Sequence, residues 1–340
     1  MRQELLYNYF YNKAISSNTP VSVMLELLTQ CNVNCEHCYI PSHQNRGLSF
    51  ETVRDLIYQM REMGVVNLSL TGGEIFLRDD LFEIIELARR LHMRVFLLSN
   101  ATLLSKQKTQ RLAQLHISEF STTLFSMNAE IHDSITQMPG SFAKTLQGIH
   151  FLKEAGIRVL VKTPLMQKNA YDYAKVKEYC DENGFTYRVS PLIFERTNGD
   201  TSPKKLRVRK TELESIMNDL DTINRNTHIH TEDIPCTALH FSFAIDCNGE
   251  VYPCNSLFYR CGNIYEQSLA DIWYHSQEMK MIKSIKTTDL TECIECSYST
   301  YCDRCPGMVL MEKKNLFACD GFAKDIAEIR ARTRCSGGNC

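Results

Sequence analysis

The residues with the clearest chemical potential are cysteines, and they are grouped rather than spread along the chain. The sequence contains 15 cysteines, of which three stand at Cys31, Cys35 and Cys38 in a C-x3-C-x2-C pattern. Eleven others fall between Cys236 and Cys340. The N-terminus has mixed polarity and no signal peptide. Thiols at short spacings in such a chain are typical of metal or cluster ligands rather than of disulfides.

The first group has the spacing to hold a small inorganic core. An extended chain reaches only about 3.3 Å per residue, so three thiolates this close in sequence can converge on one cluster. A 4Fe-4S cluster normally takes four cysteines, and no fourth stands near Cys31–Cys38. One iron would therefore be open to a ligand that is not protein. A zinc loop is the alternative, although zinc needs four ligands and is typically bound by paired C-x2-C groups.

The elements that must position these residues follow an alternating pattern. Apolar, β-rich runs alternate with helical patterns, which is typical of repeated βα units around a parallel sheet. Strands are expected at 21–28, 66–70, 94–99, 119–124, 157–165 and 185–192, with helices near 50–63, 80–91, 106–115, 141–155 and 171–183. About six units fall short of the eight of a closed barrel. The sequence therefore predicts an α/β fold, a partial (β/α)6 TIM barrel.

The predicted barrel spans residues 21–226 and follows an N-terminal extension, 1–20, that shows no complete fold. After about residue 226 the pattern changes to short hairpin pieces around Asn248-Gly249 and then to closely spaced cysteines. We therefore expect residues 227–340 to form a second, small cysteine-rich domain and tail.

At this point the sequence resembles the radical S-adenosylmethionine (SAM) superfamily, whose defining motif is C-x3-C-x2-C after the first barrel strand. The resemblance implies that SAM chelates the open iron and that reductive cleavage yields a 5′-deoxyadenosyl radical. Gly72, Gly73 and Glu74 follow the second strand and are similar to the family's Gly-Gly-Glu motif, which holds the SAM amino group. Glycines allow close backbone approach, and a carboxylate suits an ammonium. Ile75 stands where the family usually has proline.

Three further residues are carried over from the same resemblance as cofactor-binding candidates. Ser99 and Asn100 end the third strand, where the family often places polar groups that contact the ribose. His37 stands at the usually aromatic position whose backbone lies against the adenine. Outside this context His37 is interpreted as a surface histidine. No catalytic side chain is assigned from the sequence.

The second cysteine group resembles the SPASM domain of peptide-modifying radical SAM enzymes, which binds two auxiliary 4Fe-4S clusters. The resemblance covers residues 236–319, and one spacing departs from it, since two residues rather than three precede Cys305. By position it implies one distal and one SAM-proximal cluster. The implied ligands are Cys293, Cys296, Cys302 and Cys319 for the distal cluster, and Cys236, Cys254 and Cys305 for the proximal one.

The ligand of the fourth iron in the proximal cluster is left undecided. It is either Cys247 or Cys261, or this iron has no protein ligand. A zinc ribbon is the alternative interpretation of the C-terminal cysteines. In zinc ribbons, however, about 15–20 residues separate the two C-x2-C pairs, whereas five residues separate Cys296 from Cys302 here. Cys180 is expected to be a packing residue on a helix, and Cys335 and Cys340 stay unassigned.

The SPASM resemblance implies an oxidoreductase-type enzyme that modifies a C–H site of a ribosomally made peptide or protein. An enzyme of haem or tetrapyrrole biosynthesis is the alternative with the same two-domain layout. A non-enzymatic iron-sulfur redox protein is the third, although it would have no use for a Gly-Gly-Glu segment. A sulfatase-maturing role is disfavoured because that branch usually carries aspartate where Asn255 stands, and an amide cannot act as a general base.

Composition restricts the partners. The net charge of −2 lacks the basic excess of a nucleic-acid binder, and no apolar run approaches the ~18 residues that span a bilayer. We expect a cytoplasmic enzyme with a peptide or protein substrate and a reductant such as flavodoxin or ferredoxin. No leader-binding domain is expected before the barrel, so substrate recognition falls to the barrel mouth, to a separate protein or to a basic run. That run comprises Lys204, Lys205, Arg207, Arg209 and Lys210.

Overall fold

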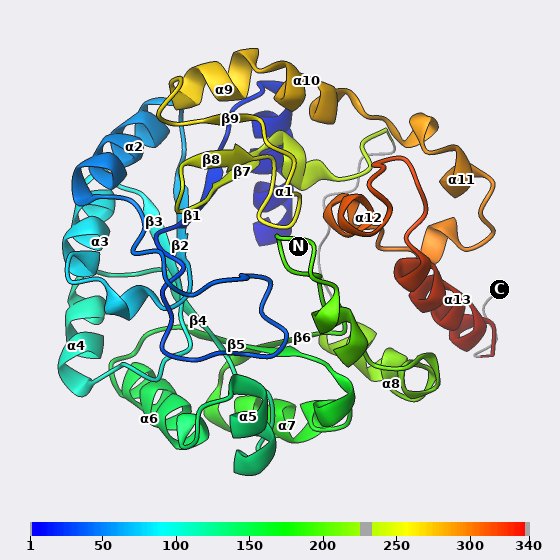
Figure 1. Ribbon diagram of the computed structural model, residues 1–340, viewed down its shortest axis with the longest axis horizontal. Helices are drawn as coiled ribbons and strands as arrows, with labels where there is room; N and C mark the ends of the chain where they lie inside the picture. Colours follow the sequence, from blue (N-terminus) through cyan, green and yellow to red (C-terminus); the bar gives the residue numbers. More distant parts are fainter. Residues whose placement is uncertain (1, 225–232, 337–340) are drawn as a thin grey trace.

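The centre of the computed structural model, which describes residues 2–224 and 233–336, is a curved parallel sheet (Figure 1). Six of its strands lie where the sequence predicts them, and each pairs in parallel with the next along the chain. The partial barrel is therefore confirmed. The strands are β1 (Ser22–Glu26), β2 (Asn67–Thr71), β3 (Arg94–Leu98), β4 (Glu119–Thr123), β5 (Val159–Pro164) and β6 (Thr186–Ser190).

Helices cover the outer, convex face of this sheet. The expected ones are α2 (Phe50–Glu62), α3 (Leu81–Arg90), α4 (Lys106–Gln114), α6 (Ser141–Glu154) and α7 (Tyr173–Asn183). One helix was not expected: α5 (Ala129–Thr136) precedes α6, and the Asn128 side chain caps it by accepting a hydrogen bond from the Glu130 N–H at 2.8 Å. Asparagine is a favoured N-cap, so a local signal for α5 was present in the sequence.

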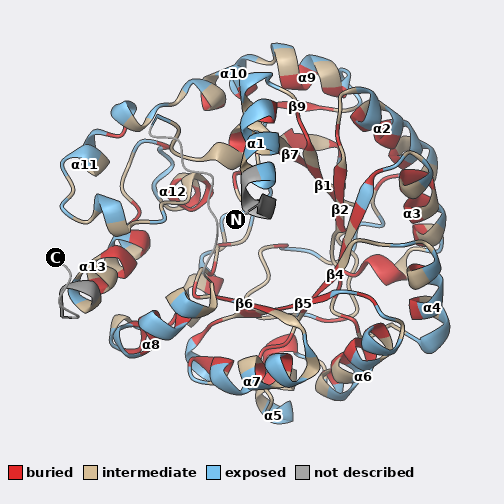
Figure 2. Ribbon diagram, turned by 180° about the vertical axis from the view of Figure 1, so that it is seen from behind, coloured by how far each residue is buried: buried red, intermediate tan, exposed pale blue. Residues whose placement is uncertain are grey.

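The strands have one apolar face and one more polar face. In β1 the side chains of Val23 and Leu25 are buried, whereas Ser22, Met24 and Glu26 between them are only partly buried. Figure 2 shows the buried residues concentrated between the strands and their covering helices. Because successive side chains of a strand point to opposite faces, this alternation directs polar groups to the concave side of the sheet.

The sheet continues past the predicted end of the barrel. Strand β7 (Ser242–Ile245) pairs in parallel with β1, and β8 (Glu250–Tyr252) and β9 (Gly262–Asn263) follow in antiparallel order. The resulting order is β6-β5-β4-β3-β2-β1-β7-β8-β9. The predicted hairpin at Asn248-Gly249 is thus confirmed, while its attachment to β1 was not foreseen. The boundary predicted near residue 226 lies outside the described residues, and the division at that point stays a proposal.

The remaining helices lie at the two ends of the chain and beside β6. Helix α1 (Arg2–Ser16) sits at the amino ends of β1 and β2, where the Asn67 amide donates to the Tyr11 hydroxyl at 3.3 Å. The others are α8 (Lys210–Ile223), α9 (Leu269–His275), α10 (Gln277–Ser284), α11 (Thr291–Ile294), α12 (Pro306–Lys313) and α13 (Gly321–Ser336). Short 3-10 turns occur at Ile75–Leu77, Gln167–Asn169, Ser202–Leu206, Thr237–His240, Thr287–Asp289 and Ser299–Tyr301. Within the described chain, no helix is both long and apolar enough to cross a membrane.

Four of the five cations in the basic run at 204–210 form ion pairs. Lys204 pairs with Glu195 at 3.1 Å, and Arg209 pairs with Glu212 at 2.5 Å. Arg207 reaches α12 through Glu312 at 2.5 Å, and Lys210 reaches Asp325 and Glu328 of α13 at 2.8 Å each. Arg207 and Lys210 thus connect the segment after β6 to the C-terminal helices. The hypothesis of an acidic-leader site on this run stays a prediction, with Lys205 and Arg209 exposed.

Candidate functional site

The loop after β1 brings Cys31, Cys35 and Cys38 to one pocket of about 250 Å³. Backbone contacts with α5 hold this loop, since the Asn34 and Glu36 N–H groups each donate to a carbonyl at its end at 3.0 Å. Within the loop, the Cys38 N–H donates to the Cys35 carbonyl at 3.1 Å. The structure therefore brings the three thiols together at the carboxyl end of β1, where parallel barrels place their chemistry.

These thiols are partly buried and close to one another. Burial raises the pKa of Cys38 to about 11, and the neighbouring Cys31 contributes to the shift. Burial also raises the pKa of Cys35, to which Cys38 and Cys31 add. A coordinating cation removes this obstacle, because a metal-bound thiol is deprotonated outright.

The thiol arrangement fits an iron-sulfur cluster better than a single zinc ion. In the described part of the chain, no three His, Cys, Asp or Glu side chains are arranged to hold one metal ion. Zinc needs its ligands around one point, whereas each thiolate of a 4Fe-4S cluster binds its own iron. Three grouped but separated thiols meet the second requirement.

Gly72 and Gly73 line the same pocket, at the carboxyl end of β2. The Gly73 N–H donates to the Leu28 carbonyl at 2.9 Å, which ties this loop to the segment before Cys31. A Cβ atom added at Gly73 would stand 2.3 Å from the carbonyl oxygens of Thr29 and Gln30. Only a residue without a side chain allows the two loops to approach this closely.

Glu74 is tied to the protein around it. Its side chain is fully buried, and its carboxylate accepts hydrogen bonds from the Ser99 hydroxyl at 2.8 and 2.9 Å and from the Asn100 N–H at 2.9 Å. A third donor is the Phe76 N–H at 3.0 Å. The contact of this carboxylate with the SAM ammonium stays a prediction. Glu74 joins the end of β2 to the end of β3 behind the pocket.

Asn100 and His37 both line the pocket. The Asn100 amide donates to Asn32 at 2.9 Å and lies 3.9 Å from the Cys31 sulfur. The His37 ring packs edge-on against Phe125 at 5.1 Å between centroids, and burial lowers its pKa to about 4. His37 is therefore neutral and only partly exposed, and its interpretation as a surface histidine applied only outside the family context. Its proposed backbone contact with adenine stays a prediction.

Sequence reasoning missed several lining residues. Ser121 and Thr123 of β4, Lys162 of β5 and His132 of α5 all face this pocket. His132 accepts a hydrogen bond from the Phe125 N–H at 3.3 Å, and burial lowers its pKa to about 4. Ser121 and Thr123 are two residues apart on one strand. Such a polar pair on one face of a barrel strand is a signal that could have identified them.

The C-terminal cysteines form two groups in space. Cys236, Cys254 and Cys305 lie together, since burial raises the pKa of Cys236 to about 11 and the other two thiols add to the shift. The Cys254 sulfur also accepts a hydrogen bond from the Ser256 N–H at 3.4 Å. This is the set that the resemblance implies for the proximal cluster.

The second group surrounds Cys302. Burial raises the pKa of Cys302 to about 11, and three other thiols contribute to the shift. They are Cys293, Cys319 and Cys296. Segments separated by α12 thus bring together four thiols, the number that a 4Fe-4S cluster takes. The assignment of these side chains as ligands stays a proposal, although their placement agrees with it.

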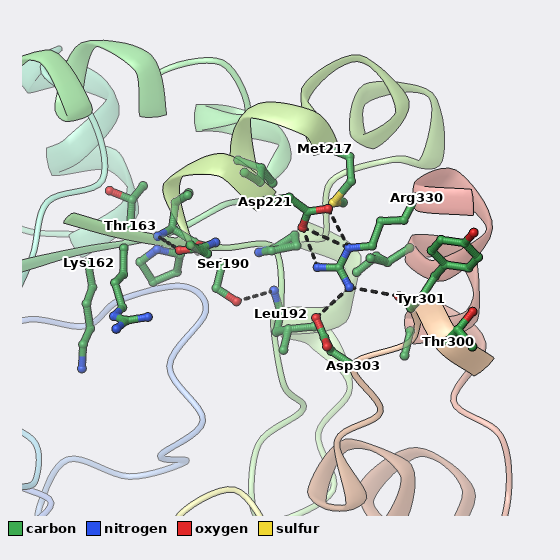
Figure 3. Close-up of a pocket in the computed structure, with 18 residues that line it drawn as sticks. Lys162, Thr163, Ser190, Leu192, Met217, Asp221, Thr300, Tyr301, Asp303 and Arg330 are labelled. Carbon is green, nitrogen blue, oxygen red and sulfur yellow. Dashed lines mark hydrogen bonds and ion pairs between the residues drawn. The ribbon is translucent and has the colours of Figure 1, made fainter. Parts of the chain in front are cut away.

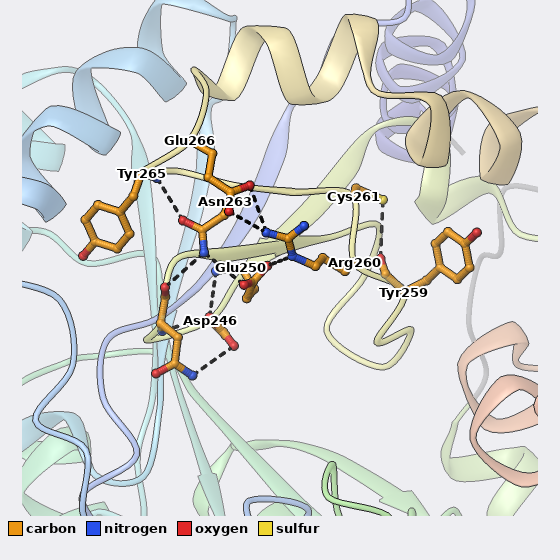
Figure 4. Close-up of polar contacts among 9 residues, drawn as sticks. Asp246, Glu250, Tyr259, Arg260, Cys261, Asn263, Tyr265 and Glu266 are labelled. Atoms are coloured by element: carbon orange, nitrogen blue, oxygen red, sulfur yellow. Dashed lines mark hydrogen bonds and ion pairs between the residues drawn. The ribbon is translucent and has the colours of Figure 1, made fainter.

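The two thiols considered for the fourth corner of the proximal cluster have other neighbours. Cys247 accepts a hydrogen bond from the Asn45 amide at 3.4 Å and lies beside Glu26. Cys261 donates to the Tyr259 carbonyl at 3.4 Å, close to the Arg260 ion pairs (Figure 4). Cys180 is fully buried on α7, as expected of a packing residue. Cys340 and the side chain of Cys335 lie outside the described residues.

Comparison with known proteins agrees with this geometry. A family model for the radical SAM superfamily matches residues 25–180, and a model for the SPASM iron-sulfur cluster-binding domain matches residues 236–306. The chain belongs to the radical SAM superfamily. This radical SAM enzyme uses 4Fe-4S clusters and SAM as cofactors.

The radical SAM enzyme is similar to proteins with different named activities. It is 24% identical to an AdoMet-dependent heme synthase of Oleidesulfovibrio alaskensis, over 76% of both chains. It is 27% identical to the subtilosin biosynthesis protein AlbA of Bacillus subtilis, over 75% of this chain and 59% of AlbA. The crystal structure of Streptococcus suis SuiB bound to its precursor peptide SuiA has a TM-score of 0.70 at 16% identity, covering 95% of this chain and 79% of SuiB. The last likeness establishes the fold.

Proposed function

We propose that this radical SAM enzyme modifies a C–H site of a ribosomally made peptide or protein. The cofactors supply, when bound, a carbon-centred radical that abstracts a hydrogen atom. The protein's part is to hold SAM and one substrate bond together in a cavity away from water. The proposed setting is the reducing cytoplasm, with a flavodoxin or ferredoxin as reductant and a separate protein to bind the leader.

The observation that carries the proposal is a second cavity of about 680 Å³ along the edge of the sheet (Figure 3). It is lined by residues 188–192, which form the end of β6 and the segment after it. Among the described strands, none pairs with the outer edge of β6. The Asn224 side chain instead bonds the Val189 N–H at 3.2 Å and the Val189 carbonyl at 2.5 Å.

The part of this strand edge that Asn224 does not occupy favours an extended chain as ligand. A peptide can add to such an edge through main-chain hydrogen bonds, with side-chain pockets providing specificity. Asn224 shows that this edge accepts an amide partner, because its side-chain amide has the same donor and acceptor as a peptide group. The printed function of AlbA and the peptide bound to SuiB agree with a peptide substrate.

A tetrapyrrole is the second candidate, favoured by the similarity to AdoMet-dependent heme synthases. Much of the wall of the larger cavity is apolar, with Met217, Leu220 and Ile326 among its lining residues. A flat macrocycle could occupy such a space. It could not, however, use the main-chain groups of β6 as an extended peptide can.

The test compares both substrate classes with the reduced, reconstituted enzyme and SAM. Each small peptide encoded beside the gene is supplied in one set of reactions, and iron coproporphyrin III in another. We expect a peptide to stimulate 5′-deoxyadenosine formation and to change in mass. Turnover of the porphyrin with no change in any of the peptides would contradict the proposal and support the second candidate.

A further inference from the structure

The SAM pocket and the larger cavity share one charged side chain, that of Lys162. It belongs to β5, whose segment Val159–Pro164 reads VLVKTP and carries no other charge. Lys162 lines both the pocket of about 250 Å³ that contains the cysteine loop and the cavity of about 680 Å³ beside β6. The side chain is only partly buried. Its ammonium therefore lies where a substrate in the larger cavity would meet SAM.

The wall around Lys162 is positively charged. Arg188 of β6 is the register partner of Lys162, so two cations stand side by side on adjacent strands. Like charges directly opposite each other destabilise a sheet unless an anion lies between them. The nearby Glu119 is engaged by Arg158 at 3.1 Å. Burial lowers the pKa of Lys162; Glu119 opposes this shift and Arg188 adds to it.

The carboxylates at the other end of the cavity have a cation of their own. Asp221 and Asp303 both pair with Arg330, each at 2.7 Å (Figure 3). Figure 3 places this ion-pair network away from Lys162, across the lining of the cavity. Together with the apolar side chains of α8 and α13, the cavity offers a cationic end beside the SAM pocket and an apolar body.

We propose that Lys162 binds a carboxylate of the substrate and thereby positions the neighbouring C–H bond beside SAM. The proposal rests on the proposed function only in that the larger cavity holds the substrate. The carboxylate can be an Asp, Glu or C-terminal group of a peptide, or a propionate of a tetrapyrrole. Lys162 acts as a positioning residue, since it takes no part in bond breaking. An ammonium–carboxylate hydrogen bond is among the stronger contacts available in such a site.

The test uses two matched pairs of probes with the full-length, reconstituted enzyme in the presence of SAM. One pair is coproporphyrin III and its tetramethyl ester. The other is a synthetic apolar hexapeptide that ends in a free Glu and its analogue that ends in Gln amide. Binding is measured by calorimetry for the natural sequence, Lys162→Met, Lys162→Arg and the control Lys175→Met. Lys175 is exposed on α7, outside both cavities.

We expect at least one acid to bind the natural sequence more tightly than its neutral counterpart. Lys162→Met should weaken binding of that acid by about 10- to 100-fold and leave the neutral probe unchanged. Lys162→Arg should restore most of the loss, and Lys175→Met should have no effect. Iron content and thermal melting check that each variant is folded. If Lys162→Met fails to fold, the proposal is still tested by Lys162→Arg. It is also tested by the binding of each acid and its neutral counterpart to the natural sequence.

Two results would overturn the proposal: acids that bind no better than their neutral counterparts, or an acid that binds Lys162→Met as tightly as the natural sequence. Comparing the porphyrin pair with the peptide pair also distinguishes failure of the Lys162 proposal from failure of the proposed function. If only the porphyrin acid depends on Lys162, the carboxylate site stands and peptide modification loses its support. If only the peptide acid does, both proposals are supported.

Discussion

At the scale of single residues, the site depends on thiols that are partly buried and grouped in space. Cys31, Cys35 and Cys38 serve one pocket, while the C-terminal thiols form separate groups. The described contacts do not link the first group to the others. Loss of the first three thiols should therefore leave the other sites able to bind iron.

The triple variant Cys31→Ala/Cys35→Ala/Cys38→Ala tests this separation. The natural sequence should bind about twelve iron atoms per chain after anaerobic reconstitution, as three 4Fe-4S clusters, and the variant about eight. Formation of 5′-deoxyadenosine, followed by chromatography, should be abolished. Cys180→Ala is the matched control, since this buried thiol lies on α7 and should cost only about 1 kcal/mol of stability. Retained SAM cleavage in the triple variant, or stoichiometric zinc in place of iron, would be incompatible with the assignment.

Much of the site could be predicted from residue types, because cysteine spacing is a local property of the sequence. The direction of the Glu74 side chain, in contrast, depends on residues that are distant in the sequence. Its carboxylate accepts hydrogen bonds from Ser99 and Asn100, which follow another strand, so the motif alone could not show these partners. Lys162 was likewise overlooked. A single lysine in an apolar strand can be recognised as a candidate site residue only when the two cavities that it lines are known.

At the scale of elements, the two loops that form the SAM pocket depend on each other. Gly73 contacts the backbone of residues 28–30, directly before the cysteine loop. A side chain at this position has to displace backbone, because the atoms that it meets are carbonyl oxygens. The effect should therefore reach SAM binding and not only stability.

Gly73→Ala should destabilise the protein by about 1–3 kcal/mol and weaken SAM binding at least about tenfold. Gly156→Ala is a control of similar cost, because Gly156 has a φ of +69° but open space around its missing Cβ. Its left-handed conformation should cost about 1–2 kcal/mol without any change in SAM binding. Denaturation curves and SAM titrations measure the two effects. Equal SAM affinities in the two variants would show that loop contact is not what shapes the pocket.

The six βα units were predictable because apolar strands and amphipathic helices alternate along the chain. The attachment of β7 to β1 was not, because it joins segments more than 200 residues apart. The local pattern of residues 242–245 does not indicate which strand of the sheet they will pair with. The short helix α5 was missed for a different reason, because its Asn128 cap is a local signal that the sequence analysis did not use.

At the scale of the whole molecule, the C-terminal helices are fastened to the barrel side by ion pairs. Arg330 of α13 binds Asp221 of α8 through both carboxylate oxygens and also reaches Asp303. The basic run at 204–210 contributes further pairs to α12 and α13. The sequence showed these cations but not their partners, most of which lie more than 100 residues away.

Arg330→Ala should lower the free energy of unfolding by about 1–2 kcal/mol, because it leaves the partly buried Asp221 carboxylate and the largely exposed Asp303 carboxylate without their cation. Arg332→Ala on the same helix should cost less than about 0.5 kcal/mol, since that side chain is largely exposed. Urea denaturation compares the two variants. Equal losses would mean that the Arg330 network does not fasten the C-terminal helices.

The central claim, that a radical formed from SAM takes a hydrogen atom from a peptide, is tested most directly by isotope transfer. Each small peptide encoded beside the gene is prepared with all its carbon-bound hydrogens replaced by deuterium. It is then incubated with the reduced enzyme and SAM, and both products are analysed by mass spectrometry. We predict that deuterium appears in 5′-deoxyadenosine and that the mass of one peptide changes. Formation of 5′-deoxyadenosine without deuterium, with every peptide unchanged, would contradict the account.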